Sequence, residues 1–441
     1  MTRDVNWPFS PGRSINIVNT EGVYLYTDDG QRLLDAAGGA IVVNVGHGLA
    51  RVADRVAEAT LQTTYVVPPW LTPGRERLAN TLTDDWLPQR LSRIHMTSGG
   101  SEAVESAIKI ALQYHAARGD HARTRILGRE ISYHGTTLVT MAAGGHEGRK
   151  KGFTHALKQS FDTYPKAPTP YPLRCPLGSH HPDAGAHYID ATRAVFEAVG
   201  AQTIAAFVAE PITGSSGGAI VPPDGYWEGI RALCDEFGVL LIMDEVMTGF
   251  GRTGLPFGYQ HWDIEPDILV SGKGLAGGYA PLGGVFTRED IGQALDDGGM
   301  NVMFHTFGAH PAACAAAAEV LTIMSEDGLV ERARTLGEKL ERRLNDAFSN
   351  HPYVAEVRGR GLLQAIELVE DRDTLEPFAA ERNITNRVVG AGLKRGVFFY
   401  GGGTGVVRDI VCMGPPFIIT EAEIDFMVDT LSAAVDQGTG G

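Results

Sequence analysis

The chain has 441 residues, and its 38 Lys and Arg against 53 Asp and Glu give a formal net charge of −15. A surface this acidic repels a phosphate backbone, so we exclude bulk nucleic-acid binding, whose affinity comes from Lys and Arg. With 43% hydrophobic residues, the composition is that of a folded protein rather than a disordered one. No apolar run approaches the roughly 20 residues of a membrane-spanning helix, so we do not expect a membrane protein.

The N-terminus and the cysteines indicate where the protein acts. The first residues, MTRDVNWPFSPGRS, lack the apolar segment of a secretory signal. Four cysteines without a CxxC pair are too few and too scattered for a disulfide framework. We therefore expect a cytoplasmic protein. Cys175, His180, His181 and His187 match no standard zinc spacing, so no metal site is predicted.

The first predicted element is a β-hairpin formed by residues 23–27 and 32–36, because Asp28, Asp29 and Gly30 between them are turn formers. The middle of the chain alternates apolar runs with helical patterns. Strands apolar throughout and separated by helices are typical of a parallel sheet buried on both faces, so the core is predicted to be doubly wound α/β. The strands are predicted at 93–96, 124–127, 203–209, 239–243 and 267–270, and the helices at 101–118 and 227–237.

The later part of the chain has a different pattern. Residues 161–186 are rich in Pro, which predicts a long surface loop without regular structure. From about residue 330 the sequence favours charged helices and short strands, which indicates a second α+β unit with the N-terminal hairpin packed on it. We expect an N-terminal segment over 1–60, a large domain over 61–320 and a small domain over 321–441.

Two apolar strands end in residues that can do chemistry. Residues 240–254, LLIMDEVMTGFGRTG, place Asp244 and Glu245 at the C-terminal end of a strand, where open parallel sheets bind ligands. The next strand ends in Ser271, Gly272, Lys273 and Gly274, and burial lowers the pKa of a lysine enough to make it a nucleophile or base. Asp244 and Lys273 are predicted to share one crevice. Alone, the acids can also be helix caps and the lysine a surface turn.

Glycine-rich segments offer candidate phosphate sites. Ser98, Gly99, Gly100 and Ser101 precede a predicted helix, and backbone N–H groups at a helix N-terminus bind anions without net positive charge. A serine N-cap with a tight turn is the simpler alternative. The glycines of SGKGLAGG fit GxGxxG, which indicates a dinucleotide site, but a lysine lies inside the turn and no acid-terminated strand follows. A Walker A loop is excluded, because no Ser or Thr follows the lysine.

Two further turns carry aromatic and polar side chains. Tyr133 and His134 follow another strand and can place an aromatic face in the same crevice, with a core aromatic as the alternative. Thr306 lies in the turn FHTFG, ahead of an Ala-rich helix.

Together and in this order, the motifs resemble those of the class III aminotransferases, which are pyridoxal-phosphate enzymes of fold type I. They include GVYLYTDDGQRLLDAAGG, TSGGSEAVESAIKIA, SYHGTT, FVAEPI, DEVMTGFGRTG, SGKGLAGGYAPLGG, HTFGAHPAACAAA, RGRGLLQAIEL and PPFIIT. The resemblance covers nearly the whole chain. It implies a large domain with a mainly parallel seven-stranded sheet flanked by helices, a smaller α+β domain built from both chain ends, and pyridoxal 5′-phosphate as cofactor.

The resemblance also implies roles for the cofactor site. Lys273 forms the internal aldimine with the cofactor aldehyde, and Asp244 pairs with the pyridine nitrogen. Tyr133 stacks on one face of the ring and Val246 packs on the other. The phosphate is held by Gly100 and Ser101 within the Ser98, Gly99, Gly100, Ser101 segment, with His134 and Glu210 also near the cofactor. Thr306 reaches the phosphate from a neighbouring subunit, which implies a homodimer or a dimer of dimers with shared active sites.

For the reaction, the resemblance implies ping-pong transfer of an amino group from an amine or ω-amino acid to a keto acid such as pyruvate. Ile41 and Trp70 are expected at the substrate. Cys412 stands where ornithine-type members carry a carboxylate-binding arginine, so Arg408 is the candidate for a mobile carboxylate-binding arginine, with Glu210 as its partner when no acid is bound.

Two alternatives use parts of the same motifs. A class III racemase or decarboxylase shares every cofactor residue. A nicotinamide-dependent dehydrogenase rests on the GxGxxG match alone.

Overall fold

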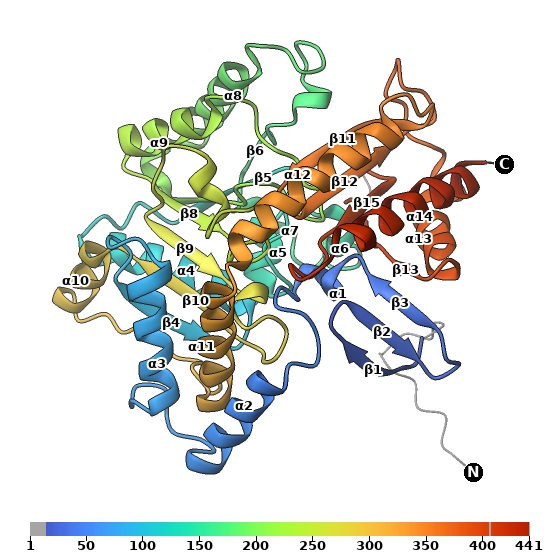
Figure 1. Cartoon of the computed structure of the whole chain (residues 1–441). Coiled ribbons are helices and arrows are strands. Elements are labelled where there is room, and N and C mark those ends of the chain that lie inside the picture. Colours follow the sequence, from blue (N-terminus) through green and yellow to red (C-terminus); the bar gives the residue numbers. More distant parts are fainter. Residues whose placement is uncertain (1–14, 405–406, 441) are drawn as a thin grey trace.

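The computed structural model describes residues 15–404 and 407–440, and it consists of a larger part around one sheet and a smaller part built from both chain ends (Figure 1). Within those residues, no helix is both long and apolar enough to cross a membrane. No group of three or more metal-ligating side chains that could hold an ion occurs in the same ranges.

The larger part is organised around a seven-stranded sheet with strand order β4-β10-β9-β8-β7-β5-β6. β10 runs antiparallel to β4 and β9, and the pairs from β9 to β6 are parallel. This confirms the predicted α/β core with a mainly parallel sheet. The strands are β4 (Arg93–Thr97), β5 (Arg125–Arg129), β6 (Lys166–Ala167), β7 (Ile204–Ala209), β8 (Leu240–Asp244), β9 (Ile268–Ser271) and β10 (Gly283–Thr287).

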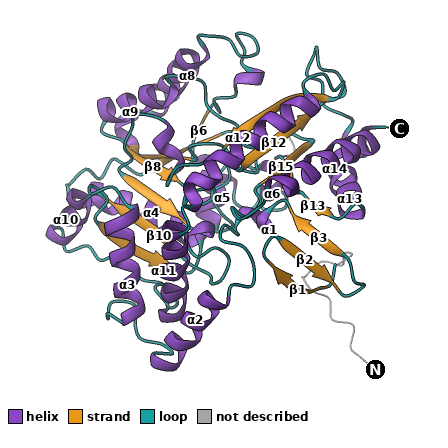
Figure 2. Cartoon of the chain, in the orientation of Figure 1, coloured by secondary structure: helices purple, strands orange, loops and turns teal. Residues whose placement is uncertain are grey.

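Helices cover both faces of this sheet (Figure 2). Successive strand residues point to opposite faces, so an apolar strand needs a partner on each side. In β8, Leu241 packs in the cluster that contains Trp227 of α9, whereas Ile242 packs in the cluster that contains Ala107 of α4. The helices of this part are α2 (Ala50–Gln62), α3 (Pro73–Thr81), α4 (Gly100–Ala117), α5 (Leu138–Ala143), α6 (Glu147–Lys150), α7 (Lys158–Asp162), α8 (Ala184–Val199), α9 (Tyr226–Phe237), α10 (Glu289–Asp297) and α11 (Pro311–Glu326).

The smaller part contains two four-stranded sheets. The predicted hairpin forms as β2 and β3, and β3 pairs in parallel with β13 from the C-terminal region, so both chain ends build one sheet. The sheet orders are β1-β2-β3-β13 and β11-β12-β15-β14. The elements are β1 (Ile17–Glu21), β2 (Tyr24–Thr27), β3 (Arg32–Asp35), α1 (Gly38–Ile41), α12 (Leu329–Phe348), β11 (Val354–Arg360), β12 (Leu363–Leu368), α13 (Ile384–Lys394), β13 (Val397–Phe398), β14 (Tyr400–Gly402), β15 (Ile410–Met413) and α14 (Glu421–Thr439).

The expectation of a structureless surface loop over residues 161–186 is wrong. Within it, β6 extends the edge of the large sheet by pairing with β5, and Tyr171 and Leu173 are buried. Arg174 donates to the carboxylate of Glu367 in β12 at 2.6 Å. The prolines prevent a long helix or strand, but they do not prevent apolar side chains from packing, and the segment bridges the two parts.

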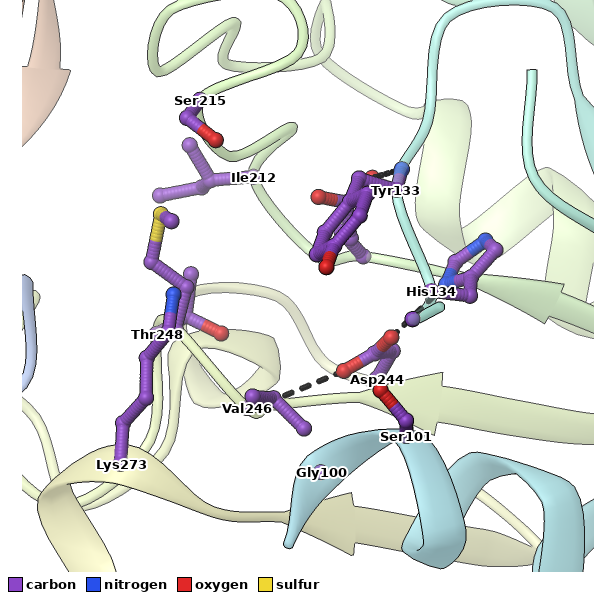
Figure 3. A pocket seen from close by; sticks show the side chains of 13 residues that line it. Gly100, Ser101, Tyr133, His134, Ile212, Ser215, Asp244, Val246, Thr248 and Lys273 are labelled. Carbon is purple, nitrogen blue, oxygen red and sulfur yellow. Dashed lines mark hydrogen bonds and ion pairs between the residues drawn. The ribbon is translucent and has the colours of Figure 1, made fainter. Parts of the chain in front are cut away.

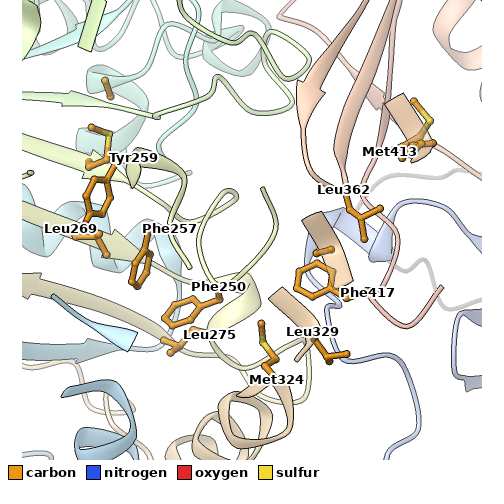
Figure 4. Close-up of a cluster of buried hydrophobic side chains, with 14 of the residues drawn as sticks. Phe250, Phe257, Tyr259, Leu269, Leu275, Met324, Leu329, Leu362, Met413 and Phe417 are labelled. Atoms are coloured by element: carbon orange, nitrogen blue, oxygen red, sulfur yellow. The ribbon is translucent and has the colours of Figure 1, made fainter. Parts of the chain in front are cut away.

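A continuous apolar core joins the larger and smaller parts (Figure 4). Phe250 lies in this core between Phe257 of the larger part and Met324 of α11, and Phe417 of the smaller part belongs to the same cluster. Burying one such side chain is worth roughly 1.5–3 kcal/mol. Arg252 is also buried there, and its guanidinium donates to two backbone carbonyls, those of Val43 and Pro415, at 2.9 and 2.6 Å. The loops around the site are therefore held from both sides.

Candidate active site

A cavity of about 180 Å³ lies at the C-terminal edge of the parallel strands (Figure 3). Its walls come from the ends of β7, β8 and β9, the N-terminus of α4 and the segment that follows β5. Parallel sheets bind their ligands at this edge. The lining residues are Gly100, Ser101, Tyr133, His134, Gly135, Glu210, Ile212, Ser215, Asp244, Val246, Met247, Thr248 and Lys273.

Asp244 is the last residue of β8, and its buried carboxylate is held by two donors. The backbone N–H of Val246 donates to Oδ1 at 3.1 Å, and Nδ1 of His134 lies 2.7 Å from Oδ2. A carboxylate out of water needs such partners to stay ionised and oriented. These two contacts therefore fix the orientation of the Asp244 carboxylate toward the cavity.

Lys273 follows β9, the parallel neighbour of β8, so the predicted convergence of Lys273 and Asp244 on one cavity is what the structure shows. Its φ of 37° is in the left-handed region, which a turn between Gly272 and Gly274 accommodates. Burial lowers the pKa of Lys273 to about 8, although the charges of Asp244 and Glu210 oppose this shift. About a tenth of the amine is therefore neutral at pH 7, far more than at the ordinary lysine pKa, and a neutral amine is a nucleophile and a base.

Gly100 and Gly272 allow three chain segments to meet, which are the start of α4, the turn before Lys273 and the segment after β8 that carries Val246. A Cβ on Gly100 would lie 2.9 Å from Cγ1 of Val246, and one on Gly272 would lie 3.3 Å from the same atom. The first turn of α4 therefore approaches the cavity with its unpaired N–H groups. Gly100 and Ser101 line the cavity, whereas Ser98 and Gly99 do not.

The expected serine N-cap is not formed. Gly99 is the N-cap of α4, and the backbone N–H of Ser98 donates to the carboxylate of Glu102 at 2.8 Å. The hydroxyl of Ser101 accepts instead from the backbone N–H of Thr136 at 3.1 Å, which ties α4 to the segment after β5.

Tyr133 forms another wall, and Glu210 fixes its backbone. One carboxylate oxygen of Glu210 accepts from the Tyr133 N–H at 3.3 Å and the other from the Gly214 N–H at 2.9 Å. Burial raises the pKa of Glu210, while His134 and Arg129 oppose the rise. The expected pairing of Glu210 with Arg408 is wrong in this structure, since its nearest guanidinium is that of the buried Arg129, at 3.9 Å.

Four other predicted residues are not brought to the cavity of this single chain. Trp70 and Thr306 are exposed, and Ile41 is buried in a cluster with Ile212, which does line the cavity. The guanidinium of Arg408 donates to the carbonyl of Phe378 at 3.2 Å, away from the lining residues. Their roles toward cofactor or substrate stay predictions.

Sequence reasoning missed several lining residues. Met247 and Thr248 follow Asp244 at the end of β8, and Ile212 and Ser215 follow Glu210 at the end of β7. Their positions in the sequence could have predicted them, because the residues just beyond each parallel strand lie at the same edge of the sheet.

These residues suit a phosphorylated aromatic aldehyde. The lysine amine can bond the aldehyde, the buried carboxylate can pair with a ring nitrogen, and Tyr133 and Val246 offer an aromatic and an aliphatic wall. The crowded glycine at the start of α4 leaves no room for a side chain where backbone N–H groups face the cavity. The donor set therefore fits pyridoxal 5′-phosphate, and this combination of fold and site defines a fold-type-I enzyme that uses it.

Comparisons with known proteins lead to the same class. The family model for aminotransferase class III matches residues 10–435. The taurine–pyruvate aminotransferase of Rhodobacter capsulatus is 34% identical, over 95% of this chain and 90% of its own. The putrescine–pyruvate aminotransferase of Pseudomonas aeruginosa is 32% identical, over 98% and 93%.

A solved amine transaminase from an uncultivated Pseudomonas species, in its PLP-bound form, is 34% identical and superposes with a TM-score of 0.91 over 99% of each chain. The chain belongs to the class III aminotransferases, and the cofactor of this family is pyridoxal 5′-phosphate. This membership removes the nicotinamide-dependent alternative, because the glycines of its motif belong to the turn that carries Lys273.

Proposed function

We propose that this aminotransferase moves an amino group from an amine or ω-amino acid to a keto acid such as pyruvate by a ping-pong mechanism. The observation that carries the proposal is the meeting of Lys273 and Asp244, from the ends of adjacent parallel strands, on one cavity. Relatives named for taurine, putrescine and pyruvate support this choice of donor and acceptor classes.

In this proposal the residues of the chain divide into those that hold the cofactor and those that move protons. When bound, the cofactor supplies an electron sink for the pair released as the substrate Cα–H bond breaks. Asp244, held by His134, keeps a proton on the pyridine nitrogen. Gly100 and Ser101 bind the phosphate through the N-terminus of α4.

Lys273 has two successive roles. Its neutral amine would hold the cofactor through the aldehyde carbon, with loss of water, until a donor amine takes its place. The freed Nζ would take the proton from the substrate Cα and return it to the cofactor carbon that carried the aldehyde, after which water would release the carbonyl product. The keto acid reverses these steps in the second half of the cycle.

The proposal includes a second copy of this chain. Thr306 is exposed, and so are its neighbours Met303, Phe304 and Phe307. An apolar surface next to a candidate phosphate ligand is what a shared active site requires. Sedimentation of the purified protein tests the dimer, and a monomer with full activity would refute the shared site.

The experiment for the function is a panel of donor amines with pyruvate, followed by loss of the visible absorbance of the cofactor and by alanine formation. Transfer from an amine or ω-amino acid supports the proposal. Continued turnover without any keto acid, beyond one equivalent of product per active site, would instead identify a racemase or a decarboxylase, which use the same cofactor residues.

A further inference from the structure

Arg149 of α6 is a cation beside the active-site tyrosine. Its guanidinium carbon lies 4.6 Å from the centroid of the Tyr133 ring, and the residue is exposed. The charges that flank it in α6 are already matched, because Lys150 pairs with Glu147 at 2.9 Å. Among the carboxylate side chains that the structure describes, none lies within ion-pair distance of Arg149.

The backbone around Arg149 is tied to the rim of the cavity. The N–H of Gly148 donates to the carbonyl of Thr404 at 3.2 Å, and the N–H of Gly403 donates to the carbonyl of Ser215 at 2.7 Å. Ser215 lines the cavity. A Cβ on Gly148 would lie 3.1 Å from the Thr404 carbonyl, so the absence of a side chain there lets α6 approach this rim.

The acidic groups that line the cavity have protein partners, whereas Arg149 packs on the lining residue Tyr133 without lining the cavity itself. Asp244 is held by His134, and Glu210 lies near Arg129. Burial is the main cause of the lowered pKa of Lys273, but the positive charge of Arg149 contributes to it as well. Tyr133 and Lys273 line the same cavity and Arg149 packs on Tyr133, so an anion bound there would be attracted to both cations.

We propose that Arg149 binds the acidic group of the substrate, which is the carboxylate of the keto acid or the carboxylate or sulfonate of an ω-amino acid donor. The planar guanidinium presents paired N–H donors that match either anion. Packing on Tyr133 holds it in place without occupying those donors. This inference rests on the proposed function and makes Arg149, rather than Arg408, the residue that selects acidic substrates.

The test compares variants of the holoenzyme. Arg149→Gln removes the charge and Arg149→Lys keeps it without the paired donors. The matched control is Arg118→Gln, because Arg118 is also exposed and lies 5.2 Å from the ring centroid of Tyr114, on the far end of α4 from the cavity. Arg408→Gln is measured in parallel.

Two readouts separate binding from chemistry. Calorimetry measures the Kd of propanoate and of ethanesulfonate, which carry the acidic group but no amine. Steady-state kinetics measures KM for pyruvate and for butanal, and for β-alanine and isopropylamine. Arg149→Gln should raise both Kd values and the KM of pyruvate and β-alanine about 10- to 100-fold, the range for losing a hydrogen bond to a charged group.

The KM of butanal and of isopropylamine should stay close to the wild-type value, and Arg149→Lys should lose less than Arg149→Gln. Unchanged binding of the acids in Arg149→Gln, equal losses for charged and uncharged substrates, or losses confined to Arg408→Gln would each overturn the inference. If the wild type transfers no amino group, the proposed function fails, yet the calorimetric comparison still decides whether Arg149 binds an acidic group.

Discussion

Replacing Asp244 by Asn tests the charge that the site holds most firmly. The substitution keeps the size of the side chain. Its carbonyl can still accept from the Val246 N–H, which lies 3.1 Å from Oδ1 of Asp244 in the wild-type structure. The amide nitrogen then faces His134, whose Nδ1 lies 2.7 Å from Oδ2, and the negative charge is gone. In the proposed function, the cofactor nitrogen would then lack the group that keeps it protonated.

The magnitude follows from the burial of this carboxylate. Asp244 is 3% exposed, so water screens its charge little. Truncating one partner of a buried charge pair costs about 2–5 kcal/mol, which slows a step that needs the pair about 30- to 5,000-fold. We expect this loss in the rate of the amine half-reaction, with the fold intact and the cofactor still bound.

The assay is a single-turnover reaction of the holoenzyme with excess donor amine, followed by stopped-flow decay of the visible absorbance. Asp235→Asn is the control, because Asp235 pairs with Arg231 at 2.7 Å on the exposed side of α9. If Asp244→Asn decays as fast as the wild type, the charge of Asp244 does not act on the cofactor, and the reasoning is refuted.

Three further predictions concern the lysine and the phosphate site. Lys273→Ala should abolish transfer while circular dichroism stays native, and borohydride should no longer fix the cofactor to the chain in mass spectra; retained fixation would assign the covalent role elsewhere. The rate at which apoenzyme takes up cofactor should rise with pH and level off near the lowered Lys273 pKa of about 8, because the neutral amine attacks; a rise that continues to the usual lysine pKa would contradict the burial of this amine. Gly100→Ala should weaken cofactor affinity, measured by fluorescence titration, because its Cβ would lie 2.9 Å from Val246 Cγ1 and displace the N-terminus of α4; unchanged affinity would count against the phosphate site there.

The sequence by itself determined the parts of the structure that follow from local pattern. Apolar runs at residues 239–243 and 267–270 predicted adjacent buried strands, and β8 and β9 form with boundaries shifted by one residue. Asp244 and Lys273 each come at the end of a predicted strand. This order predicted that both side chains lie at one edge of the sheet, because parallel strands all end on the same side. The turn residues between 27 and 32 likewise predicted the hairpin, since turn chemistry is local.

Only the tertiary structure decided which groups meet across long stretches of chain. His134 and Asp244 are 110 residues apart, and no periodicity or spacing relates them. The partner of Glu210 is Arg129 rather than Arg408, because β5 and β7 are neighbours in the sheet while the Arg408 guanidinium is held by the Phe378 carbonyl. Residues 161–186 contain the strand β6, which forms by pairing with β5 although the proline-rich composition of the segment disfavours a strand. Such contacts depend on the order and spacing of packed elements, and a local sequence pattern carries no information about either.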